Sequence, residues 1–372
     1  MYGVAENGKY CIPDSGFMIP CLQSHIPNGD WAYFCFYGMP GYSKIQRKER
    51  SFMERYLLTV IPEFEPSDLE RIRKAAEERG FTALFYNTPE EAAGMLPQAE
   101  IVFGYDGSLA LEGGSLKWLC TPFAGINQFF NKNVFLGGQA VLTNSSGAYG
   151  TAIAEHVIMV LLEILRREKE YEEIIAGRGW VRDLPIRSIR GSRITLMGTG
   201  DIGQETALRL KSFSPASMIG MNRKGGNPGG LFDRIIGREE LNDVLPGTDV
   251  LILSLPGTPD TKGILGKEEM ALLPDGAVII NVGRGTSIDQ SALEKELLSG
   301  RLYAGLDVFE KEPVPAESPL WTCRSLIITP HVAGNMMLPF TVDRIIQMFL
   351  EDLDRYCAGK RLLHLADVRA GY

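Results

Sequence analysis

Three residues with chemically useful side chains each follow an apolar run that has the pattern of a β-strand. The residues are Arg284, Glu312 and His331, and the runs are 278–282, 304–309 and 326–328. In an open α/β sheet the loops at the carboxyl ends of the strands carry the site, so we expect these side chains to lie together. Taken singly, they could be a surface arginine, a loop carboxylate and a turn histidine. Together they offer an anion-binding fork, a proton donor and a partner for its imidazole.

A glycine-rich turn between a strand-like and a helix-like segment is the second chemical signal. Gly198-x-Gly200-x-x-Gly203 follows the apolar run 194–197 and leads into helix-compatible sequence through Leu210. In this context the first glycine permits a tight turn, the second lets a pyrophosphate approach the backbone, and the third lets the helix pack on the strand. The helix start adds free N–H donors and the positive dipole end. The pattern predicts a dinucleotide site.

The residues after the next predicted strand, 217–221, indicate which dinucleotide binds. In an NAD site an acidic residue usually binds the ribose 2′-hydroxyl about 20 residues after the glycine turn. This chain has Asn222, Arg223 and Lys224 there instead. Two cations without a carboxylate favour a 2′-phosphate, so we predict NADP, with NADPH preferred and NAD as a second cofactor. The alternative is a solvated basic turn that binds no ligand.

The composition limits the function classes. A chain of 372 residues, 45% hydrophobic and 23% charged, is typical of a globular enzyme of about two domains. A net charge of −8 gives no basic footprint for nucleic acid. No apolar run reaches the ~18 residues of a membrane helix, and the N-terminus lacks the pattern of a signal peptide. The six cysteines show no metal-ligand spacing, so we expect reduced thiols, no bound metal, no membrane partner and a cytoplasmic protein.

Strand-like and helix-like segments alternate from Met53 onward, which predicts parallel α/β layers. Ser67-x-x-Glu70 has the spacing of a capping box and predicts the start of a helix. The stretch 151–167 is apolar on more than one side, which predicts a helix buried between domains or subunits. Residues 1–52 differ in character, and we interpret them as an N-terminal extension that is disordered or not native. The alternative is an arm that covers the active site or a partner subunit.

Several motifs, in this order, resemble those of the D-isomer-specific 2-hydroxyacid dehydrogenase family. They are FAG at 123–125, GTGDIG at 198–203, LPGTPDT at 255–261, NVGRG at 281–285, GLDVFEKEP at 305–313 and TPHVAG at 329–334. The resemblance covers the chain from about residue 53 to its last residue. It implies an α/β fold in which a Rossmann-type dinucleotide-binding domain, 151–335, is inserted in a smaller flavodoxin-like parallel α/β substrate domain, 53–150 and 336–372. It also implies a homodimer.

The resemblance further implies a role for each matched residue. The matched catalytic residues are Arg284, Glu312 and His331. The expected substrate-binding groups are Arg284, His331 and the backbone amides of Phe123, Ala124 and Gly125. Asp307 matches a residue near the nicotinamide carboxamide. The other expected cofactor-binding residues are Gly198, Gly200, Asp201, Ile202, Gly203, Asn222, Arg223, Lys224, Pro256, Thr261, Val282 and Gly334.

We therefore expect an NAD(P)-dependent oxidoreductase that transfers a hydride between NADPH and a 2-keto acid to give a D-2-hydroxy acid, reversibly. Glyoxylate, hydroxypyruvate and larger 2-keto acids all fit this expectation. Two alternatives stay open: a dinucleotide-sensing binding protein, such as the family's corepressors, and a formate- or phosphite-type dehydrogenase. The role of two segments is also open. Residues 105–107 could face the substrate, and Met336 and Met337 could line a pocket or pack at the domain seam.

Overall fold

The computed structural model describes residues 54–104, 114–129 and 132–368, together with the backbone of four strands near the N-terminus. These strands are β1 (Gly3–Val4), β2 (Tyr10–Ile12), β3 (Ile19–His25) and β4 (Trp31–Cys35), and they form an antiparallel sheet in that order. The chain divides into two compact units, Met1–Glu54 and Arg55–Tyr372. Most of the predicted N-terminal extension lies outside the described residues, so its interpretation stays a prediction.

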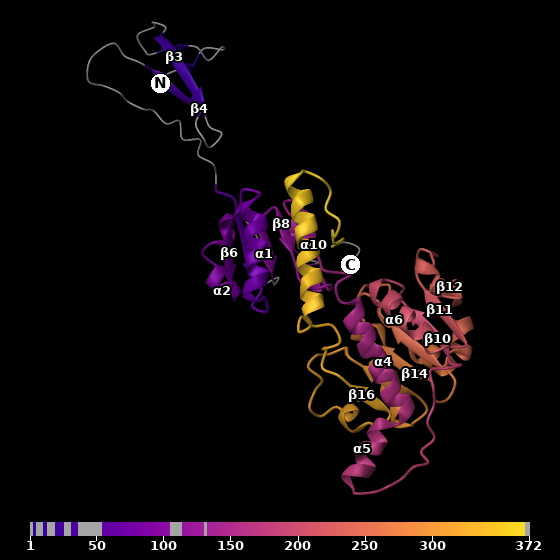
Figure 1. The fold of residues 1–372 in the computed structure, drawn as a ribbon. Coiled ribbons are helices and arrows are strands. Elements are labelled where there is room, and N and C mark those ends of the chain that lie inside the picture. The colour runs from indigo at the N-terminus through magenta and orange to yellow at the C-terminus, as the bar shows by residue number, and fades with distance from the viewer. Residues whose placement is uncertain are drawn as a thin grey trace. The chain divides into compact units, whose positions relative to one another are not determined.

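Seven parallel strands form the larger sheet of the second unit (Figure 1), in the order β12-β11-β10-β13-β14-β15-β16. They are β10 (Arg193–Met197), β11 (Ser217–Met221), β12 (Arg234–Ile236), β13 (Val250–Leu253), β14 (Val278–Asn281), β15 (Tyr303–Leu306) and β16 (Leu326–Ile328). The order reverses between β10 and β13, which is the position where doubly wound sheets bind a dinucleotide. Every residue of β13 and β14 is buried, as expected for parallel strands covered by helices on both faces.

Five parallel strands form the smaller sheet, in the order β6-β5-β7-β8-β9. They are β5 (Tyr56–Val60), β6 (Thr82–Tyr86), β7 (Ala99–Gly104), β8 (Trp118–Cys120) and β9 (Val141–Thr143). In chain order this is the strand arrangement of flavodoxin-like folds. The two sheets together confirm the predicted fold class.

One long helix, α4 (Gly150–Arg166), carries the chain from the smaller sheet to the larger one. It packs against α6 (Asp201–Lys211), the helix that follows the glycine turn, and against β15. Gly305 in β15 permits this close packing, because a Cβ there would lie 2.2 Å from Cγ1 of Val160. The apolar stretch predicted at 151–167 is therefore a helix that packs on α6 and on the larger sheet, and the exposed Met159 leaves part of its apolar surface outside these contacts.

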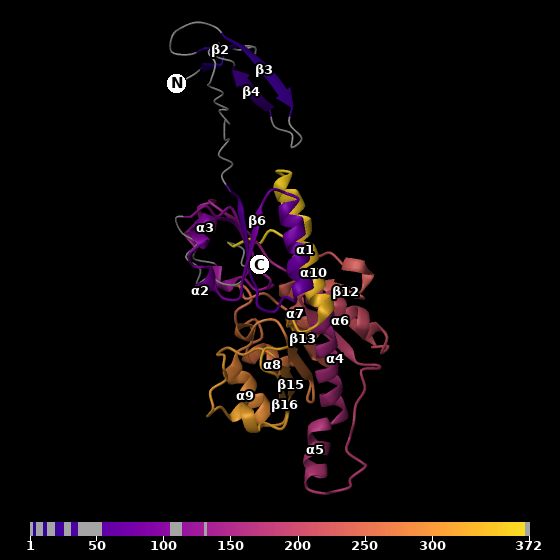
Figure 2. The ribbon, with the colours of Figure 1, turned by 60° about the vertical axis from the view of Figure 1, so that its left-hand side comes forward.

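A second long helix, α10 (Pro339–Cys357), follows the larger sheet and packs on the smaller one. It lies beside α1 (Pro66–Glu77) in both views (Figures 1 and 2). The Phe349 ring stacks on that of Phe103 in β7, with 4.1 Å between ring centroids. These contacts support a discontinuous substrate domain, whose boundaries stay a prediction.

The start of α1 differs from the prediction. The helix begins at Pro66 rather than after Ser67, and Glu65 is its N-cap residue. The Glu65 N–H donates to the Asp68 carboxylate at 3.3 Å, so the capping box is closed by Asp68 and not by Glu70. Proline at the first helical position has a preset φ and no N–H to satisfy, which explains the earlier start.

Shorter elements complete the second unit. The α-helices are α2 (Pro89–Ala92), α3 (Asn133–Leu136), α5 (Glu168–Ala176), α7 (Leu241–Val244), α8 (Lys267–Leu272) and α9 (Gln290–Leu298). The 3₁₀ turns are Leu96–Gln98, Asn127–Phe129, Pro228–Gly230, Arg238–Glu240, Leu245–Gly247, Gly285–Ser287 and Pro319–Thr322. Within the described ranges, no helix combines the length and the apolar character needed to span a bilayer.

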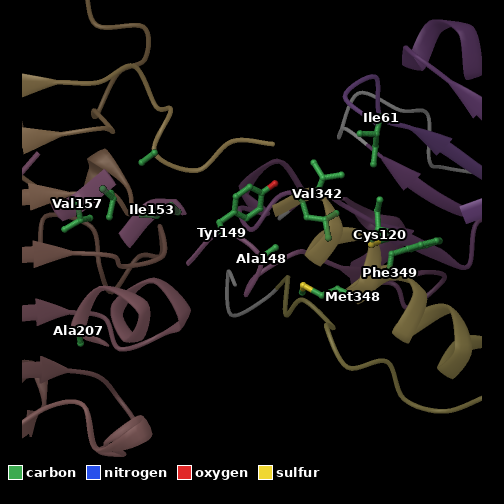
Figure 3. Close-up of a cluster of buried hydrophobic side chains, with 14 of the residues drawn as sticks. Ile61, Cys120, Ala148, Tyr149, Ile153, Val157, Ala207, Val342, Met348 and Phe349 are labelled. Carbon is green, nitrogen blue, oxygen red and sulfur yellow. The ribbon is translucent and has the colours of Figure 1, made fainter. Parts of the chain in front are cut away.

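A continuous hydrophobic cluster fills the joint between the smaller sheet and α4 (Figure 3). Tyr149, the residue before α4, lies between Ile153 of α4 and Val342 of α10 in this view. The Tyr149 side chain is buried, with 5% of its surface exposed. Because a buried large apolar side chain contributes about 1.5–3 kcal/mol, this cluster stabilises the point where the chain passes between the two sheets.

Candidate active site

A cavity of about 550 Å³ lies where loops from the carboxyl ends of both parallel sheets meet. Twelve of the predicted site residues line it: Phe123, Ala124, Gly125, Gly200, Asp201, Ile202, Pro256, Val282, Arg284, Asp307, His331 and Gly334. They follow six different strands, namely β8, β10, β13, β14, β15 and β16. The structure therefore brings together residues up to about two hundred positions apart, as the rule for open α/β sheets predicts.

His331 forms a short hydrogen bond with Glu312 at this cavity. The imidazole Nδ1 lies 2.7 Å from Oε2 of the carboxylate, and Oε1 accepts the N–H of Phe309 at 2.8 Å. His331 lines the cavity but Glu312 does not, so the carboxylate binds the imidazole on the side away from the cavity. This arrangement leaves Nε2 of His331 for a ligand in the cavity, as in other histidines oriented by a carboxylate.

The loop that carries His331 is shaped by the buried carboxylate of Asp307. His331 has a left-handed backbone, with a φ of 56°, which is unusual for a non-glycine residue. Asp307 is 3% exposed, and it accepts hydrogen bonds from the Thr329 hydroxyl at 2.6 Å, the Val332 N–H at 2.9 Å and the Ala333 N–H at 3.0 Å. These bonds hold the strained turn in place. The predicted contact of Asp307 with the nicotinamide carboxamide stays a prediction.

His156 of α4 supports the same loop from inside the protein. Its Nε2 lies 3.1 Å from the Thr329 hydroxyl. Burial lowers the pKa of His156, and the nearby Asp307 carboxylate opposes this effect. We therefore interpret His156 as a neutral, structural histidine.

Arg284 follows β14 and lies between two glycines, Gly283 and Gly285, at which there is no room for a side chain. A Cβ at Gly283 would lie 2.6 Å from the Leu255 carbonyl oxygen, and a Cβ at Gly285 would lie 1.9 Å from the carbonyl carbon of Phe309. The Arg284 guanidinium donates through Nη1 to the Gly283 carbonyl at 2.7 Å. Burial lowers the pKa of Arg284, and the Glu312 carboxylate opposes this shift. The guanidinium is a partly desolvated cation beside the cavity, suited to bind a carboxylate.

The glycine turn after β10 has the space and the donors that a dinucleotide needs. Gly198 has a φ of 106°, and a Cβ at Gly203 would lie 2.1 Å from the Gly198 carbonyl oxygen, so glycine is required at both. A Cβ at Gly200 would meet nothing within 4 Å, so a requirement for glycine there would come from a ligand. Helix α6 begins at the next residue, with its N–H groups directed to this space. The turn therefore fits a pyrophosphate.

Asn222 builds the loop that presents the two predicted phosphate-binding cations. Its carboxamide oxygen accepts the N–H groups of Lys224 at 3.0 Å and Gly225 at 2.7 Å, while Nδ2 donates to the Thr199 hydroxyl at 2.7 Å. Arg223 and Lys224 are exposed on this loop, at the end of β11. Like Gly198, Gly203 and Asn222, they lie outside the cavity lining. Asn222 thus joins the loop that carries Arg223 and Lys224 to Thr199 of the glycine turn, which is distant in the sequence.

Thr261 stabilises the loop that follows β13. Its hydroxyl donates to the Pro256 carbonyl at 2.6 Å and accepts the Thr258 N–H at 2.9 Å. Pro256 lines the cavity, whereas Thr261 does not. The structure therefore places Thr261 where it can shape the cavity wall.

Asp201 lies between the glycine turn and α4. Its carboxylate accepts the Gly150 N–H, and the approach is so close that a Cβ at Gly150 would lie 2.3 Å from Oδ2. Burial raises the pKa of Asp201, and the Glu205 carboxylate raises it further. A carboxyl group whose pKa is raised by folding stabilises the protein below its ordinary pKa, and this contribution is lost as the pH rises through the raised value.

Asp201→Asn is therefore expected to increase the free energy of unfolding at pH 7, because the amide keeps an oxygen for the Gly150 N–H and carries no charge. The gain should shrink toward pH 4, where the native carboxyl group takes up its proton. Urea denaturation at both pH values measures this, with Asp183→Asn, at an exposed aspartate, as the control. An equal gain at both pH values would contradict the assignment.

Several cavity residues were not predicted. Ser254 follows β13, so the strand-end rule could have found it. Ser146, Gly147 and Tyr149 come from the segment between β9 and α4, which has no motif. Among the described residues, Met336 and Met337 do not line the cavity. Met336 packs on the main hydrophobic cluster, and Met337 is 81% exposed.

Two further expectations concern a substrate contact of the segment 105–107 and the absence of a metal site. The segment 105–107 lies outside the described residues. In the part of the chain that is described, no group of three His, Cys, Asp or Glu side chains could hold a metal ion. The expectation that no metal binds stays a prediction.

A Rossmann sheet with a carboxylate-oriented histidine at its carboxyl edge is the arrangement of a nicotinamide-dependent oxidoreductase. The comparisons with known proteins agree with this class.

Residues 158–333 match the family model described as "D-isomer specific 2-hydroxyacid dehydrogenase, NAD binding domain". Over 229 residues the chain is 34% identical to glyoxylate/hydroxypyruvate reductase HPR3 of Arabidopsis thaliana, which covers 60% of this chain and 68% of that protein. Glyoxylate/hydroxypyruvate reductase A of Salmonella paratyphi B is 36% identical over 187 residues, which is 50% of this chain but only 59% of the relative.

Solved structures are similar over a longer part of the chain. A D-isomer specific 2-hydroxyacid dehydrogenase family protein from Aeromonas salmonicida has a TM-score of 0.75 and 30% identity, and the match covers 85% of this chain and 99% of that one. The NADPH-dependent glyoxylate/hydroxypyruvate reductase of Sinorhizobium meliloti, in complex with NADP and sulfate, has a TM-score of 0.72 and 27% identity, covering 86% and 100%. The chain belongs to the D-isomer specific 2-hydroxyacid dehydrogenase family.

Proposed function

We propose that this protein reduces 2-keto acids to D-2-hydroxy acids with NADPH, in a reversible reaction, and accepts NAD as a second cofactor. The observation that carries the proposal is the His331–Glu312 pair, which lies with Arg284 at one cavity together with the glycine turn. The similarity to glyoxylate/hydroxypyruvate reductases supports 2-keto acids as the substrate class. Oxidation of NADPH by the purified protein in the presence of glyoxylate or hydroxypyruvate tests the reaction class.

Arg284 binds the substrate in this proposal. Its planar guanidinium offers parallel N–H donors that match a carboxylate and the neighbouring carbonyl oxygen. The backbone amides of Phe123, Ala124 and Gly125, which line the same cavity, would bind this carboxylate as well. Two sets of donors that both bind the substrate fix the carbonyl carbon in one orientation, which lowers the entropic part of the barrier.

His331 supplies the proton. When bound, the nicotinamide supplies the hydride to the carbonyl carbon. The Nε2–H of His331 donates its proton to the carbonyl oxygen, and in the oxidative direction Nε2 accepts that proton. Glu312 fixes the ring through Nδ1 and stabilises the positive charge of the protonated imidazole. Arg284 stabilises the negative charge that develops on the oxygen before the proton arrives.

The basic loop after β11 is the basis for the NADPH preference. We expect the double variant Arg223→Ala/Lys224→Ala to raise the KM for NADPH by about 100-fold or more, because each of the two charge-assisted hydrogen bonds contributes about 1.5–3 kcal/mol and every 1.4 kcal/mol is about tenfold. The KM for NADH should change little, because NADH has no 2′-phosphate. Steady-state kinetics with both cofactors at a saturating 2-keto acid concentration measures the effect.

A matched control removes two cations elsewhere. Lys360→Ala/Arg361→Ala changes an exposed basic pair after α10 that does not line the cavity. This variant should keep both KM values, which would exclude a general effect of net charge. An equal rise for NADPH and NADH in the Arg223 and Lys224 variant would contradict a 2′-phosphate site.

The remaining predictions concern the alternative functions, the oligomeric state and the cellular location. No observation favours a dinucleotide sensor or a formate- or phosphite-type dehydrogenase over the reductase. Exposed apolar side chains on α4 and in the segment after it, among them Met159, Ile175 and Trp180, favour a homodimer through this face. The homodimer and the cytoplasmic location stay predictions, as does the absence of a nucleic-acid partner.

A further inference from the structure

The backbone of the 121–125 loop is held along its length by the segment 144–149, which connects β9 to α4. Four consecutive carbonyl oxygens of the loop accept hydrogen bonds from this segment. Ser145 makes two of these bonds: its hydroxyl donates to Thr121 O at 3.0 Å, and its N–H donates to Phe123 O at 3.0 Å. Ser145 is 1% exposed, so water does not compete for these bonds.

Two further side chains bind the other two carbonyl oxygens of the loop, those of Pro122 and Ala124. The Asn144 Nδ2 donates to Ala124 O at 2.8 Å, and the Tyr149 hydroxyl donates to Pro122 O at 2.7 Å. Both side chains are buried, with 6% and 5% of their surfaces exposed. Breaking one of these bonds would leave a buried carbonyl oxygen without a donor, which costs more free energy than it does for an exposed carbonyl. The bonds therefore favour a single conformation of the loop.

Fixing the carbonyls also fixes the amides of the loop. In a planar trans peptide the C=O of one residue and the N–H of the next point in opposite directions. The bonds to Phe123 O and Ala124 O therefore turn the N–H groups of Ala124 and Gly125 away from the segment 144–149. Among the described residues, neither of these two N–H groups donates a hydrogen bond. Both residues line the cavity, so two free donors remain there for an anion.

Tyr149 connects this loop to the rest of the molecule. It directly precedes α4, and its ring lies in the cluster between α4 and α10 (Figure 3). Burial raises the pKa of the Tyr149 phenol, so its hydroxyl remains a donor throughout the neutral range. A rigid aromatic ring places its hydroxyl with little conformational freedom, which suits it to position a backbone group.

We propose that Asn144, Ser145 and Tyr149 are positioning residues that hold the 121–125 loop so that the amides of Ala124 and Gly125 bind the substrate carboxylate. This inference rests on the proposed function, because the reaction supplies the carboxylate. The positioning residues do not touch the substrate through the groups that hold the loop. They act by keeping two N–H donors in place before the substrate arrives, which reduces the cost of ordering the loop on binding.

The first test compares Tyr149→Phe and Asn144→Ala with the wild type in steady-state kinetics. Each variant removes a donor to one loop carbonyl, and Tyr149→Phe keeps the ring in the cluster. We expect the KM for the 2-keto acid to rise about 10-fold, corresponding to the loss of one hydrogen bond. The KM for NADPH should be unchanged, and kcat should fall by less than the KM rises.

The control removes a similar phenol hydroxyl from the same domain. The Tyr356 hydroxyl donates to Oε1 of Glu100 at 2.8 Å, and Tyr356 does not line the cavity. Tyr356→Phe should lower the thermal stability about as much as Tyr149→Phe while keeping the KM for the 2-keto acid. If Tyr149→Phe lowers stability and leaves this KM unchanged, its role is structural only and the inference fails.

A second measurement separates this inference from the proposed function. Hydrogen exchange of the full chain without substrate, measured by mass spectrometry, should be faster in peptides covering 119–126 and 142–149 of Tyr149→Phe and Asn144→Ala than in Tyr356→Phe. Equal exchange would overturn the positioning role even if the wild type reduces no 2-keto acid. Faster exchange in a protein that reduces none would keep the loop assignment and reject the reaction instead.

Discussion

Replacing His331 with asparagine is expected to lower kcat by about 10²- to 10⁴-fold, the contribution of a general acid or base. The residue is the proton donor in our account, and asparagine has no group that can donate a proton at neutral pH. The affinity for NADPH should stay close to that of the wild type, because the glycine turn and the basic loop are unchanged. Stopped-flow or steady-state absorbance gives kcat, and fluorescence titration with NADPH gives the affinity.

A second histidine–carboxylate pair provides the matched control. The Nδ1 of His364 lies 3.0 Å from Oδ2 of Asp352, and neither residue lines the cavity. His364→Asn should lower stability, since Asp352 is 1% exposed, and should keep kcat in the protein that remains folded. Glu312→Gln should give a loss smaller than that of His331→Asn. If His331→Asn keeps wild-type turnover, His331 is not the proton donor.

Replacing Arg284 with lysine is expected to reduce kcat/KM by about 10²- to 10³-fold, although the charge is conserved. Lysine offers a point charge in place of a planar fork, so it cannot bind the carboxylate and the carbonyl oxygen at once. The loss should appear in both kcat and KM, because in the proposed mechanism Arg284 binds the substrate carboxylate and also stabilises the charge that develops on the carbonyl oxygen. Steady-state kinetics with one 2-keto acid at saturating NADPH measures it.

The control for Arg284 is another arginine that is held by the protein but lies outside the cavity. Arg301 donates to the carbonyls of Leu273 and Met270, at 2.8 and 2.7 Å. Arg301→Lys should affect unfolding more than kcat/KM. Equal kinetic losses in the two variants would show that Arg284 acts on stability and would reject its role in substrate binding.

The sequence was sufficient to predict the elements that carry the chemistry. Apolar runs indicated β14, β15 and β16, and a predicted site residue follows each of them within a few positions: Arg284, Glu312 and His331. The glycine turn could be interpreted because its physical requirements are local: a φ of 106° at Gly198 and no room for a Cβ at Gly203 both arise within a few residues. The recognised family and the fold class are confirmed.

What the sequence did not reveal comprises local details of short elements and contacts between distant segments. Pro66 and Glu65 start α1 two residues before the predicted cap, because a proline at the first helical position outweighs a serine. The strands β9 and β12 were not predicted, because each has only three residues and neither is a purely apolar run: Thr143 ends β9 and Arg234 begins β12. The hydrogen bonds from Asn144 and Tyr149 to the 121–125 loop join segments about 20 or more residues apart, and the segment 144–149 carries no motif.

The central claim is that this protein reduces a 2-keto acid with NADPH, and the loss of absorbance of the reduced nicotinamide tests it most directly. Purified full-length protein would be assayed with NADPH and with NADH against 2-keto acids from glyoxylate to phenylpyruvate. We expect oxidation of NADPH well above that of NADH with at least one of these acids. Faster oxidation of NADH would reject the 2′-phosphate site but keep the enzyme. Tight binding of NADPH with no turnover of any 2-keto acid would contradict the claim itself and favour a dinucleotide sensor.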